Sequence, residues 1–454
     1  MPSSSTTSPP AGEPRGGTYA LLGRVVTAAL MLMLAAAPAL AAPKAKITLW
    51  HAMGGARYEA ITQGIAKAFN EAYPDYEVEP LFTGSYAETL TKAIAAIRAG
   101  NPPDIVQVYE VGTQTMIDSG AIIPVTDLVP PGAIDFDDYI QPILRYYTVG
   151  GKLYSMPFNS STAILYYNKD AFRKAGLDPE RPPRTYAELE EMGRRIVASG
   201  AARAAITFGW PAWIFEQTFA YHNQLYADND NGRAGRATRV LFDNEFGRMV
   251  ASRWAQWARE GLLMYGGREY APNRAFLSGE VAMLLQSTSQ VSTIEQAASF
   301  EVGTAFLPRI EGQPEGKSVI GGASLWVINR RGRTQAERDA IVAFLRFLAE
   351  PEQTVQWHKD TGYFPATETA VRLLEQEGWF AQHPNYATAF RQIQMGPDTP
   401  ATRGVLLGNF VQIRDIVDTA MERIFSGSLT PAQALAQAAQ QANRVLEDYN
   451  RLYR

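Results

Sequence analysis

Hydrophobic residues between positions 46 and 109 change repeatedly from the spacing of a strand to the spacing of a helix. The strand-like segments are residues 47–50, 76–82 and 104–109, and the helix-like segments are residues 58–72 and 90–97. Pro74 and Gly100 follow the two helix-like segments and are expected to end them. The order strand, helix, strand, helix, strand predicts an α/β fold with a mostly parallel sheet.

Helical periodicity returns in the second half of the chain. The expected helices there are residues 246–260, 336–348, 412–425 and 431–451. Thr430 and Pro431 have the order expected at the start of the last of them. Thr185 and Glu188 form a capping box ahead of a further helix. Since no repeat or flexible linker divides the chain, the simplest architecture is two α/β lobes in close contact, with a ligand in the crevice between them.

The first 41 residues carry the features of a secretory signal peptide. Arg15 and Arg24 accompany the apolar stretch Val25–Leu34, and residues 39–41 fit the small-x-small cleavage pattern. An uncleaved membrane anchor is the alternative, but the stretch is shorter than the roughly 20 apolar residues that a spanning helix needs. We expect export and cleavage after Ala41, which leaves roughly 410 residues, enough for two lobes of ordinary size.

Charge and cysteine content narrow the class of protein. The formal net charge is −4, whereas a nucleic-acid-binding protein needs a basic face. The chain has no cysteine, so it has neither disulfides nor an N-terminal cysteine for lipid attachment. We therefore expect a protein that is free in the periplasm of a bacterium with two membranes.

Motifs for catalysis do not stand out. The four histidines are not spaced as metal ligands, and the chain has no HExxH, GxSxG or Walker motif. Two distant carboxylates could still form a glycosidase site, because that pair needs no local motif. Chemistry stays open on these grounds, and a binding protein is the better interpretation.

Polar and aromatic side chains in two segments are candidates for ligand contacts. Residues 159–162, Asn-Ser-Ser-Thr, precede an apolar run at 163–167 that we expect to be a buried strand. Their side chains could cap or close a turn, or they could donate hydrogen bonds to an anion. Trp210 and Trp213 surround Pro211 in an expected loop, either as core residues or as an aromatic wall for a small polyol.

Three further positions have both a functional and a structural interpretation. Gly322, after Gly321, could serve a turn or let backbone N–H groups approach an anion. Glu110 follows the third strand, where open α/β sheets bind ligands, or it is simply an exposed charge. Arg414 is a candidate anion ligand, or it forms a surface pair with Asp418 four residues later.

Several motifs spread over the chain carry a family resemblance. The segments are VQVYEVGT, PFNSST, IGGASLW, TGYFPAT and GNFVQIR, with a more general YNKDAF segment. They resemble the periplasmic sn-glycerol-3-phosphate-binding proteins of ABC importers, within the large extracellular solute-binding family that includes maltose-binding protein. The resemblance runs from about Ile47 to the C-terminal helix.

The resemblance implies a two-lobed periplasmic binding protein fold of type II, like maltose-binding protein, with a hinge and a ligand cleft between the lobes. It implies a monomer without catalysis, cofactor or metal, which passes sn-glycerol-3-phosphate to the permease subunits and ATPase of an importer. The implied N-terminal lobe comprises residues 42–159 and 308–352, and the implied C-terminal lobe comprises residues 160–307 and 353–454. The implied ligand-binding residues are Tyr86, Glu110, Ser161, Trp210, Trp213, Ser287, Gly322, Tyr363 and Arg414.

The family's serine-rich run reads QSTSQ here, so Ser287 can share its role with Thr288 or Ser289. Charge arguments place Arg414 and the hydroxyl groups on the phosphate. The same arguments place Glu110, beside Tyr86, at the opposite, glycerol end of the ligand. A glycerophosphodiester such as glycerophosphocholine, an oligosaccharide, and more remotely an exported hydrolase of phosphorylated glycerol are the alternatives.

Overall fold

The structure is a computed structural model that describes residue 8 and residues 44–453. The predicted signal peptide, apart from Ser8, therefore lies outside the described residues. Within residues 44–453, no helix has both the length and the apolar character needed to cross a membrane.

The first sheet has six strands, in the order β2-β1-β3-β12-β4, with β7 pairing beside β12. Its strands are β1 (Ala45–His51), β2 (Tyr76–Phe82), β3 (Ile105–Tyr109), β4 (Ile122–Ile123), β7 (Met156–Ser161) and β12 (Gly321–Ile328). The first three strands are parallel, as the sequence predicts, but β12 is antiparallel to β3, β4 and β7. The expectation of a mostly parallel sheet therefore holds only for β1, β2 and β3. The antiparallel strand β12 begins more than 200 residues after β3 ends, so the local strand–helix pattern could not predict its direction.

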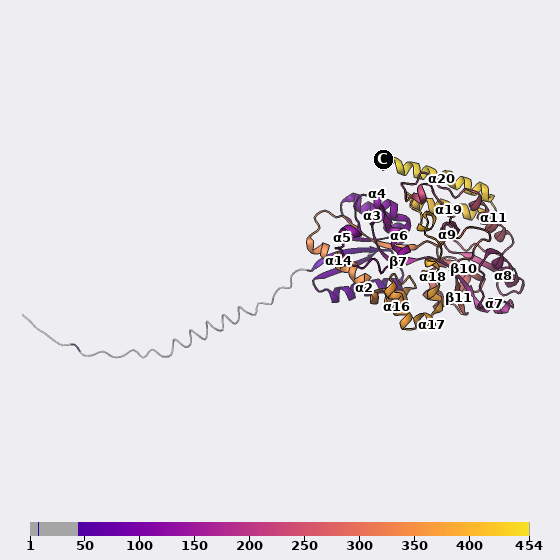
Figure 1. The fold of residues 1–454 in the computed structure, drawn as a ribbon, viewed down its shortest axis with the longest axis horizontal. Helices are drawn as coiled ribbons and strands as arrows, with labels where there is room; N and C mark the ends of the chain where they lie inside the picture. The colour runs from indigo at the N-terminus through magenta and orange to yellow at the C-terminus, as the bar shows by residue number, and fades with distance from the viewer. Residues whose placement is uncertain (1–7, 9–43, 454) are drawn as a thin grey trace, which may run out of the picture. The chain divides into compact units, whose positions relative to one another are not determined.

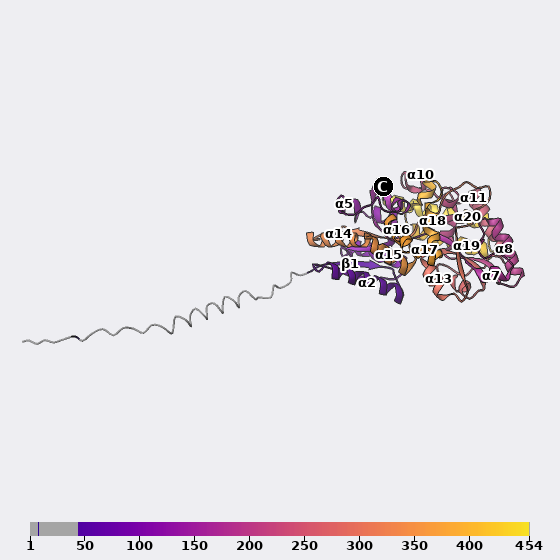
Figure 2. The same cartoon turned by 60° about the horizontal axis from the view of Figure 1, so that its bottom comes forward.

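Helices from both ends of this lobe's sequence cover the same part of the sheet. Phe69 of α2 (Ala56–Ala72) packs edge-on against Phe344 and Phe347 of α14 (Gln335–Ala349), with ring centroids 5.2 and 5.7 Å apart. Figure 2 shows these two helices close to β1. The other elements here are α3 (Tyr86–Ala99), α4 (Thr113–Asp118), α5 (Val125–Leu128), α6 (Gln141–Tyr147), β5 (Thr148–Val149) and β6 (Lys152–Leu153).

The second sheet has four strands, in the order β11-β8-β10-β9. They are β8 (Ala163–Asn168), β9 (Ala204–Phe208), β10 (Val281–Ser287) and β11 (Val302–Ala305), and the first three are buried along their whole length. The buried strand expected at residues 163–167 is thus present. No helix starts at residues 159–162, because β7 runs directly into β8, so a helix-capping role for those side chains is wrong.

Helices of the second half surround this four-stranded sheet (Figure 1). The long ones are α8 (Tyr186–Ala198), α11 (Glu245–Arg259), α19 (Phe410–Phe425) and α20 (Pro431–Leu452). The shorter ones are α7 (Lys169–Lys174), α9 (Pro211–Tyr221), α10 (Asp228–Gly232), α12 (Asn273–Leu277), α13 (Val291–Ala297), α17 (Trp379–Gln382) and α18 (Thr388–Gln394). Two further helices, α15 (Pro351–Thr361) and α16 (Glu368–Gln376), pack against each other, and α15 also contacts α13 and α14.

Two predicted helix starts can be compared with the structure. Thr430 caps α20 and forms a capping box with Gln433. Thr185 caps α8 by accepting from the Glu188 N–H, but the Glu188 carboxylate accepts from the Arg184 N–H, so the predicted box is only half formed. Both helices are present, because the hydrogen bond of the N-cap side chain is made in each and satisfies one free N–H group even without the second bond of the box.

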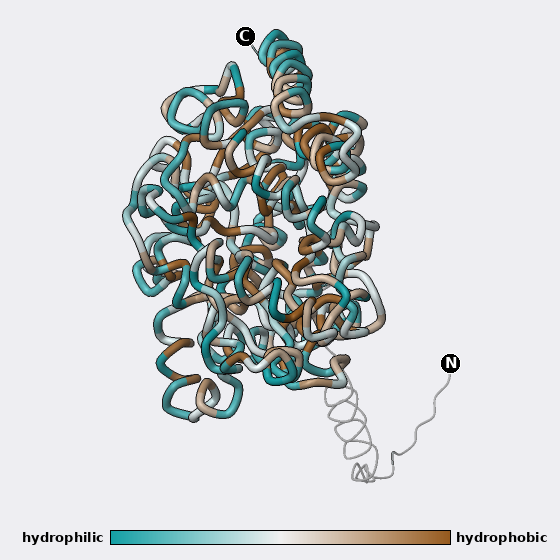
Figure 3. Tube along the Cα trace, turned by 90° about the vertical axis from the view of Figure 1, so that its right-hand side faces the viewer, coloured by the Kyte–Doolittle hydropathy of each residue, from teal (hydrophilic) through white to brown (hydrophobic). Residues whose placement is uncertain are grey.

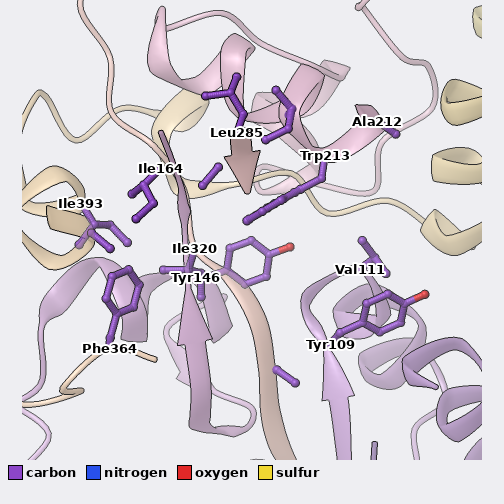
Figure 4. Packing of buried hydrophobic residues seen from close by; sticks show 14 of the residues in the cluster. Tyr109, Val111, Tyr146, Ile164, Ala212, Trp213, Leu285, Ile320, Phe364 and Ile393 are labelled. Carbon is purple, nitrogen blue, oxygen red and sulfur yellow. The ribbon is translucent and has the colours of Figure 1, made fainter. Parts of the chain in front are cut away.

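A single cluster of buried apolar side chains includes residues of both sheets, among them Tyr109 of β3 and Leu285 of β10 (Figure 4). Figure 3 shows apolar segments concentrated inside and hydrophilic ones along the outer loops. We call the elements around the six-stranded sheet the N-terminal lobe and those around the four-stranded sheet the C-terminal lobe. β7 continues two residues past the boundary expected at position 159, and the lobe boundaries themselves stay a prediction.

Candidate functional site

The nine residues named from the resemblance line one cavity of about 40 Å³. Its complete lining is Tyr86, Tyr109, Glu110, Ser161, Trp210, Trp213, Tyr270, Ser287, Ser289, Gly322, Tyr363 and Arg414. A second cavity of about 400 Å³ shares six of these residues, namely Tyr86, Tyr109, Trp210, Tyr270, Tyr363 and Arg414. Residues from nine segments of the sequence therefore meet at one place between the two sheets.

The N-terminal lobe places its contributions at the ends of strands. Glu110 is the first residue after β3 and is buried. Tyr86 opens α3, directly after Ser85, which forms a capping box with Glu88. The Tyr86 ring stacks on Tyr109, with centroids 5.2 Å apart and planes 8° from parallel. The helix cap and the stacking on Tyr109 therefore hold the Tyr86 side chain in place.

Ser161 and Gly322 come from two paired strands. Gly321 of β12 faces Ser161 of β7, and Gly322 faces Ser160. Gly322 has φ of +84°, and a Cβ atom there would lie 1.9 Å from the Asn159 carbonyl oxygen. Only glycine permits this backbone conformation together with this close approach. The glycine pair belongs to the strand and not to a turn before it.

The two tryptophans flank the start of α9. Trp210 has a left-handed backbone, with φ of 56°, and Pro211 is the first residue of the helix. Asp418 accepts a hydrogen bond from the Ala212 N–H at 2.8 Å and holds this start in place. Trp213 is a buried residue of the helix, so the expectation that it lies in a loop is wrong. Proline at the first helical position is compatible with a helix, which explains the difference.

Several lining residues carry hydroxyl groups, and we call six of them the hydroxyl cluster: Tyr86, Ser161, Tyr270, Ser287, Ser289 and Tyr363. The hydroxyls of Tyr86 and Tyr363 are 3.5 Å apart, and those of Ser287 and Ser289 are 3.0 Å apart. Asn159 also donates to the Tyr86 oxygen at 2.6 Å. Burial raises the pKa of Tyr86 and of Tyr270 well above the ordinary value, so both stay protonated and can donate hydrogen bonds.

Glu110 and Arg414 also line the cavity, and Glu216 contacts Arg414; we call these three residues the charged cluster. Arg414 Nη1 is 2.7 Å from Glu110 Oε1, and Nη2 is 2.8 Å from Glu216 Oε2. The exposed fraction of the side chain is 10% for Arg414 and 4% for each glutamate. The two carboxylates raise the pKa of Arg414 despite its burial, so the guanidinium stays charged. Burial raises the pKa of Glu216, and Arg414 opposes that rise.

This geometry corrects two expectations about Arg414. Glu110 and Arg414 are in direct contact, so they do not lie at opposite ends of a ligand. Asp418 is buried and bonds to the start of α9, so a surface pair between Arg414 and Asp418 is also wrong. Both errors arose because the ion-pair partners of Arg414, Glu110 and Glu216, lie far from it in the sequence, Glu216 by 198 residues.

Sequence reasoning missed Tyr109, Tyr270 and Glu216. Tyr109 directly precedes Glu110 in the VYE motif and could have been noticed there. Tyr270 and Glu216 carry no local signal, because one follows an irregular stretch and the other is an interior helix residue. Ser289 lines the cavity together with Ser287. That Ser287 shares its role in ligand binding with Ser289 stays a prediction.

Two buried N–H donors of lining residues have no hydrogen-bond partner among the described residues: Trp213 Nε1 and Arg414 Nε. Buried polar groups are nearly always paired, so an unpaired donor beside a cavity needs an explanation. Within residues 44–453, no group of three His, Cys, Asp or Glu residues is placed to hold a metal ion.

Comparison with known proteins agrees with the resemblance. The family described as bacterial extracellular solute-binding protein matches residues 64–388. The sn-glycerol-3-phosphate-binding periplasmic protein UgpB of Escherichia coli K12 is 38% identical over 413 residues, which cover 89% of this chain and 93% of that protein. The protein of the same name from Pectobacterium atrosepticum is 37% identical over 440 residues, 95% of this chain and 97% of the relative.

Solved structures show the same fold at lower identity. UgpB from Mycobacterium tuberculosis, in complex with glycerophosphocholine, has a TM-score of 0.76 at 22% identity and covers 89% of this chain and 98% of its own. A cyclic α-maltosyl-1,6-maltose binding protein from Arthrobacter globiformis has a TM-score of 0.73 at 21% identity, with coverage of 89% and 100%. The fold is therefore the two-lobed, maltose-binding-protein-like solute-binding fold, and the chain belongs to the bacterial extracellular solute-binding proteins and, within them, to the family of the periplasmic proteins named UgpB.

Proposed function

We propose that this protein is exported by a cleavable signal peptide, captures sn-glycerol-3-phosphate in the periplasm without chemical change, and passes it to the permease and ATPase of an ABC importer. The relatives with 37–38% identity carry that ligand in their names. The observation that carries the proposal is the cavity lining. It combines a cluster of neutral hydroxyl donors, a buried ion-pair cluster and two unpaired N–H donors, which together fit a small ligand with many oxygens.

We infer the orientation of the ligand from the charged cluster. A phosphate beside Arg414 would also face the carboxylates of Glu110 and Glu216. Carboxylates accept hydrogen bonds from glycerol hydroxyls, and they repel phosphate. We therefore place the phosphate on the hydroxyl cluster, with Gly322, and the glycerol hydroxyls against Glu110 and Arg414. Trp210 and Trp213 cover the carbon skeleton.

A glycerophosphodiester is the second candidate ligand, and the cavity of about 400 Å³ favours it. A phosphodiester keeps an anionic phosphate and adds a headgroup, which needs room beyond the small cavity. The six lining residues that the two cavities share would let such a headgroup extend from one into the other. An oligosaccharide fits less well, because a neutral sugar leaves the hydroxyl cluster without an anion.

Isothermal titration of the mature protein with sn-glycerol-3-phosphate, glycerophosphocholine and maltose, followed by product analysis, tests the proposal. We expect stoichiometric binding of sn-glycerol-3-phosphate, recovery of the intact ligand, and no binding of maltose. Release of inorganic phosphate would identify a hydrolase. Binding of maltose without binding of sn-glycerol-3-phosphate would identify a sugar-binding protein.

Adjacent serines supply a matched pair of variants for the phosphate contact. Ser161 lines the cavity and Ser160 does not, because successive residues of a strand face opposite sides. Losing a hydrogen bond to a charged group costs about 1.5–3 kcal/mol. Ser161→Ala should therefore weaken binding about ten- to hundredfold, whereas Ser160→Ala should leave it near the wild-type value. Equal effects of the two substitutions would count against the placement of the phosphate.

A further inference from the structure

Glu216 is a buried carboxylate that does not line the cavity but contacts Arg414, which does. It belongs to α9, whose eleven residues are all buried, and its side chain is 4% exposed. Buried charges are costly unless paired, and one carboxylate, Glu110, already pairs with Arg414. A second carboxylate on the same guanidinium is therefore more than the neutralisation of Arg414 requires.

The cluster contains two acidic groups and one basic group. The neighbouring charges do not reverse this excess. Asp418, one helical turn after Arg414 on α19, adds a further carboxylate, and the nearby Arg268 is engaged by Glu422 at 2.7 Å and Asp415 at 3.6 Å. Burial raises the pKa of Tyr146 and of Tyr226, which lie beside the cluster, well above the ordinary value, so both stay neutral and do not change its charge.

We propose that Glu216 is a specificity-determining residue that makes the glycerol end of the site reject ligands with an anionic group there. The inference rests on the proposed function, because it needs the phosphate to lie on the hydroxyl cluster. Glu216 acts through Arg414: it occupies one edge of the guanidinium and cancels charge that would otherwise attract an anion. A hydroxyl group at this place meets acceptors and donors, whereas a carboxylate meets like charges.

A pair of ligands isolates this effect. sn-Glycerol-3-phosphate and the 3-phosphoglycerate enantiomer with the same arrangement at C2 share the phosphate and the C2 hydroxyl. They differ at C1, where a hydroxymethyl group is replaced by a carboxylate. Binding of both is measured by titration calorimetry at pH 8. The wild-type protein should prefer sn-glycerol-3-phosphate by about a hundredfold or more, because placing a carboxylate beside like charges lowers the affinity by a factor of that size.

Glu216→Gln keeps the size of the side chain and removes its charge. The preference should fall at least about tenfold, mainly because 3-phosphoglycerate binds better. Glu216→Asp, which keeps the charge, should retain most of the preference. Glu190→Gln is the matched control, since Glu190 is also largely buried and pairs with an arginine, Arg253, but lies away from the cavity. It should leave the preference unchanged.

Each outcome decides the question. A folded Glu216→Gln protein with a preference within about threefold of wild type would overturn the inference, as would an equal change in Glu190→Gln. If Glu216→Gln does not fold, as judged by thermal melting, Glu216→Met supplies an apolar variant suited to this buried helix. A wild-type protein that binds both ligands equally overturns the inference alone, whereas one that binds neither overturns the proposed function.

Discussion

Asp418 shows how a single residue can link the stability of the fold to pH. Burial raises the pKa of Asp418 from 3.8 to about 6. The hydrogen bond that Asp418 accepts from the Ala212 N–H lowers this pKa and so opposes part of the rise. The folded protein thus holds this proton more tightly than the unfolded chain does. The resulting stabilisation is full below pH 4 and is lost as the pH rises through 6, and it amounts to at most about 3 kcal/mol.

Asp418→Asn keeps an acceptor for the Ala212 N–H but has no charge to bury. Compared with the wild type, the variant should gain in free energy of unfolding as the pH rises from 4 to 7, by about 2 kcal/mol. Urea unfolding at unit pH steps measures this. Asp415→Asn, an exposed aspartate on the same helix, is the control and should show no such trend. A constant difference between Asp418→Asn and wild type across the range would refute the assignment.

At the scale of elements, the pairing of β7 with β12 sets the position of Ser161. Gly322→Ala should be destabilised by roughly 1–2 kcal/mol from its positive φ and by more from the clash with the Asn159 carbonyl oxygen, 1.9 Å from the added Cβ. It should also weaken binding of sn-glycerol-3-phosphate, since Ser161 would shift.

Gly332→Ala is the matched control for Gly322→Ala. Gly332 has φ of +74°, but a Cβ atom there meets no atom within 4 Å. The control should lose only the cost of the positive φ, about 1 kcal/mol, and should keep wild-type affinity. Thermal melts and calorimetry on both variants separate the two costs. Similar losses in the two proteins would mean that the close approach of the strands is unimportant.

The elements that the sequence predicts well are those built from local contacts. The helix expected at 336–348 is observed as α14 (Gln335–Ala349), and the one expected at 412–425 is α19 (Phe410–Phe425). Helical periodicity is a property of neighbouring residues, so it can be read without the fold. The insertion of β12 beside β3 and the pairing of Arg414 with Glu216 join distant segments, and no local pattern records them. Tyr270 likewise lies beside cavity residues that are distant from it in the sequence, so no local pattern predicts its position.

At the scale of the whole molecule, the small cavity implies motion. A volume of about 40 Å³ holds no more than a few water molecules, so a ligand such as sn-glycerol-3-phosphate cannot enter without the lining residues moving apart. Rigid-body closure of two lobes about a hinge is the usual solution in periplasmic binding proteins. We infer that contacts joining the lobes in the present structure belong to the closed state.

Arg57 and Tyr58 of α2 make such contacts. Arg57 donates to Ser292 at 2.6 Å and to the Asp360 carbonyl at 2.5 Å, and Tyr58 donates to the Ser289 carbonyl at 3.1 Å. Arg57→Ala should therefore lower the population of the closed state and weaken the apparent affinity for sn-glycerol-3-phosphate about five- to tenfold, although Arg57 does not line the small cavity.

Lys67→Ala is the control for the loss of a positive charge on the same helix, because Lys67 is exposed and forms an ion pair within α2, with Glu71 at 3.8 Å. Small-angle scattering with and without ligand should show the wild type contracting at lower ligand concentrations than Arg57→Ala does, with Lys67→Ala behaving as the wild type. Intrinsic fluorescence should follow the same order, since Trp210 lies at the cavity. If Arg57→Ala contracts and binds as the wild type does, the contacts of α2 do not hold the lobes together, and closure must depend on the ligand and the Arg414–Glu110 pair instead.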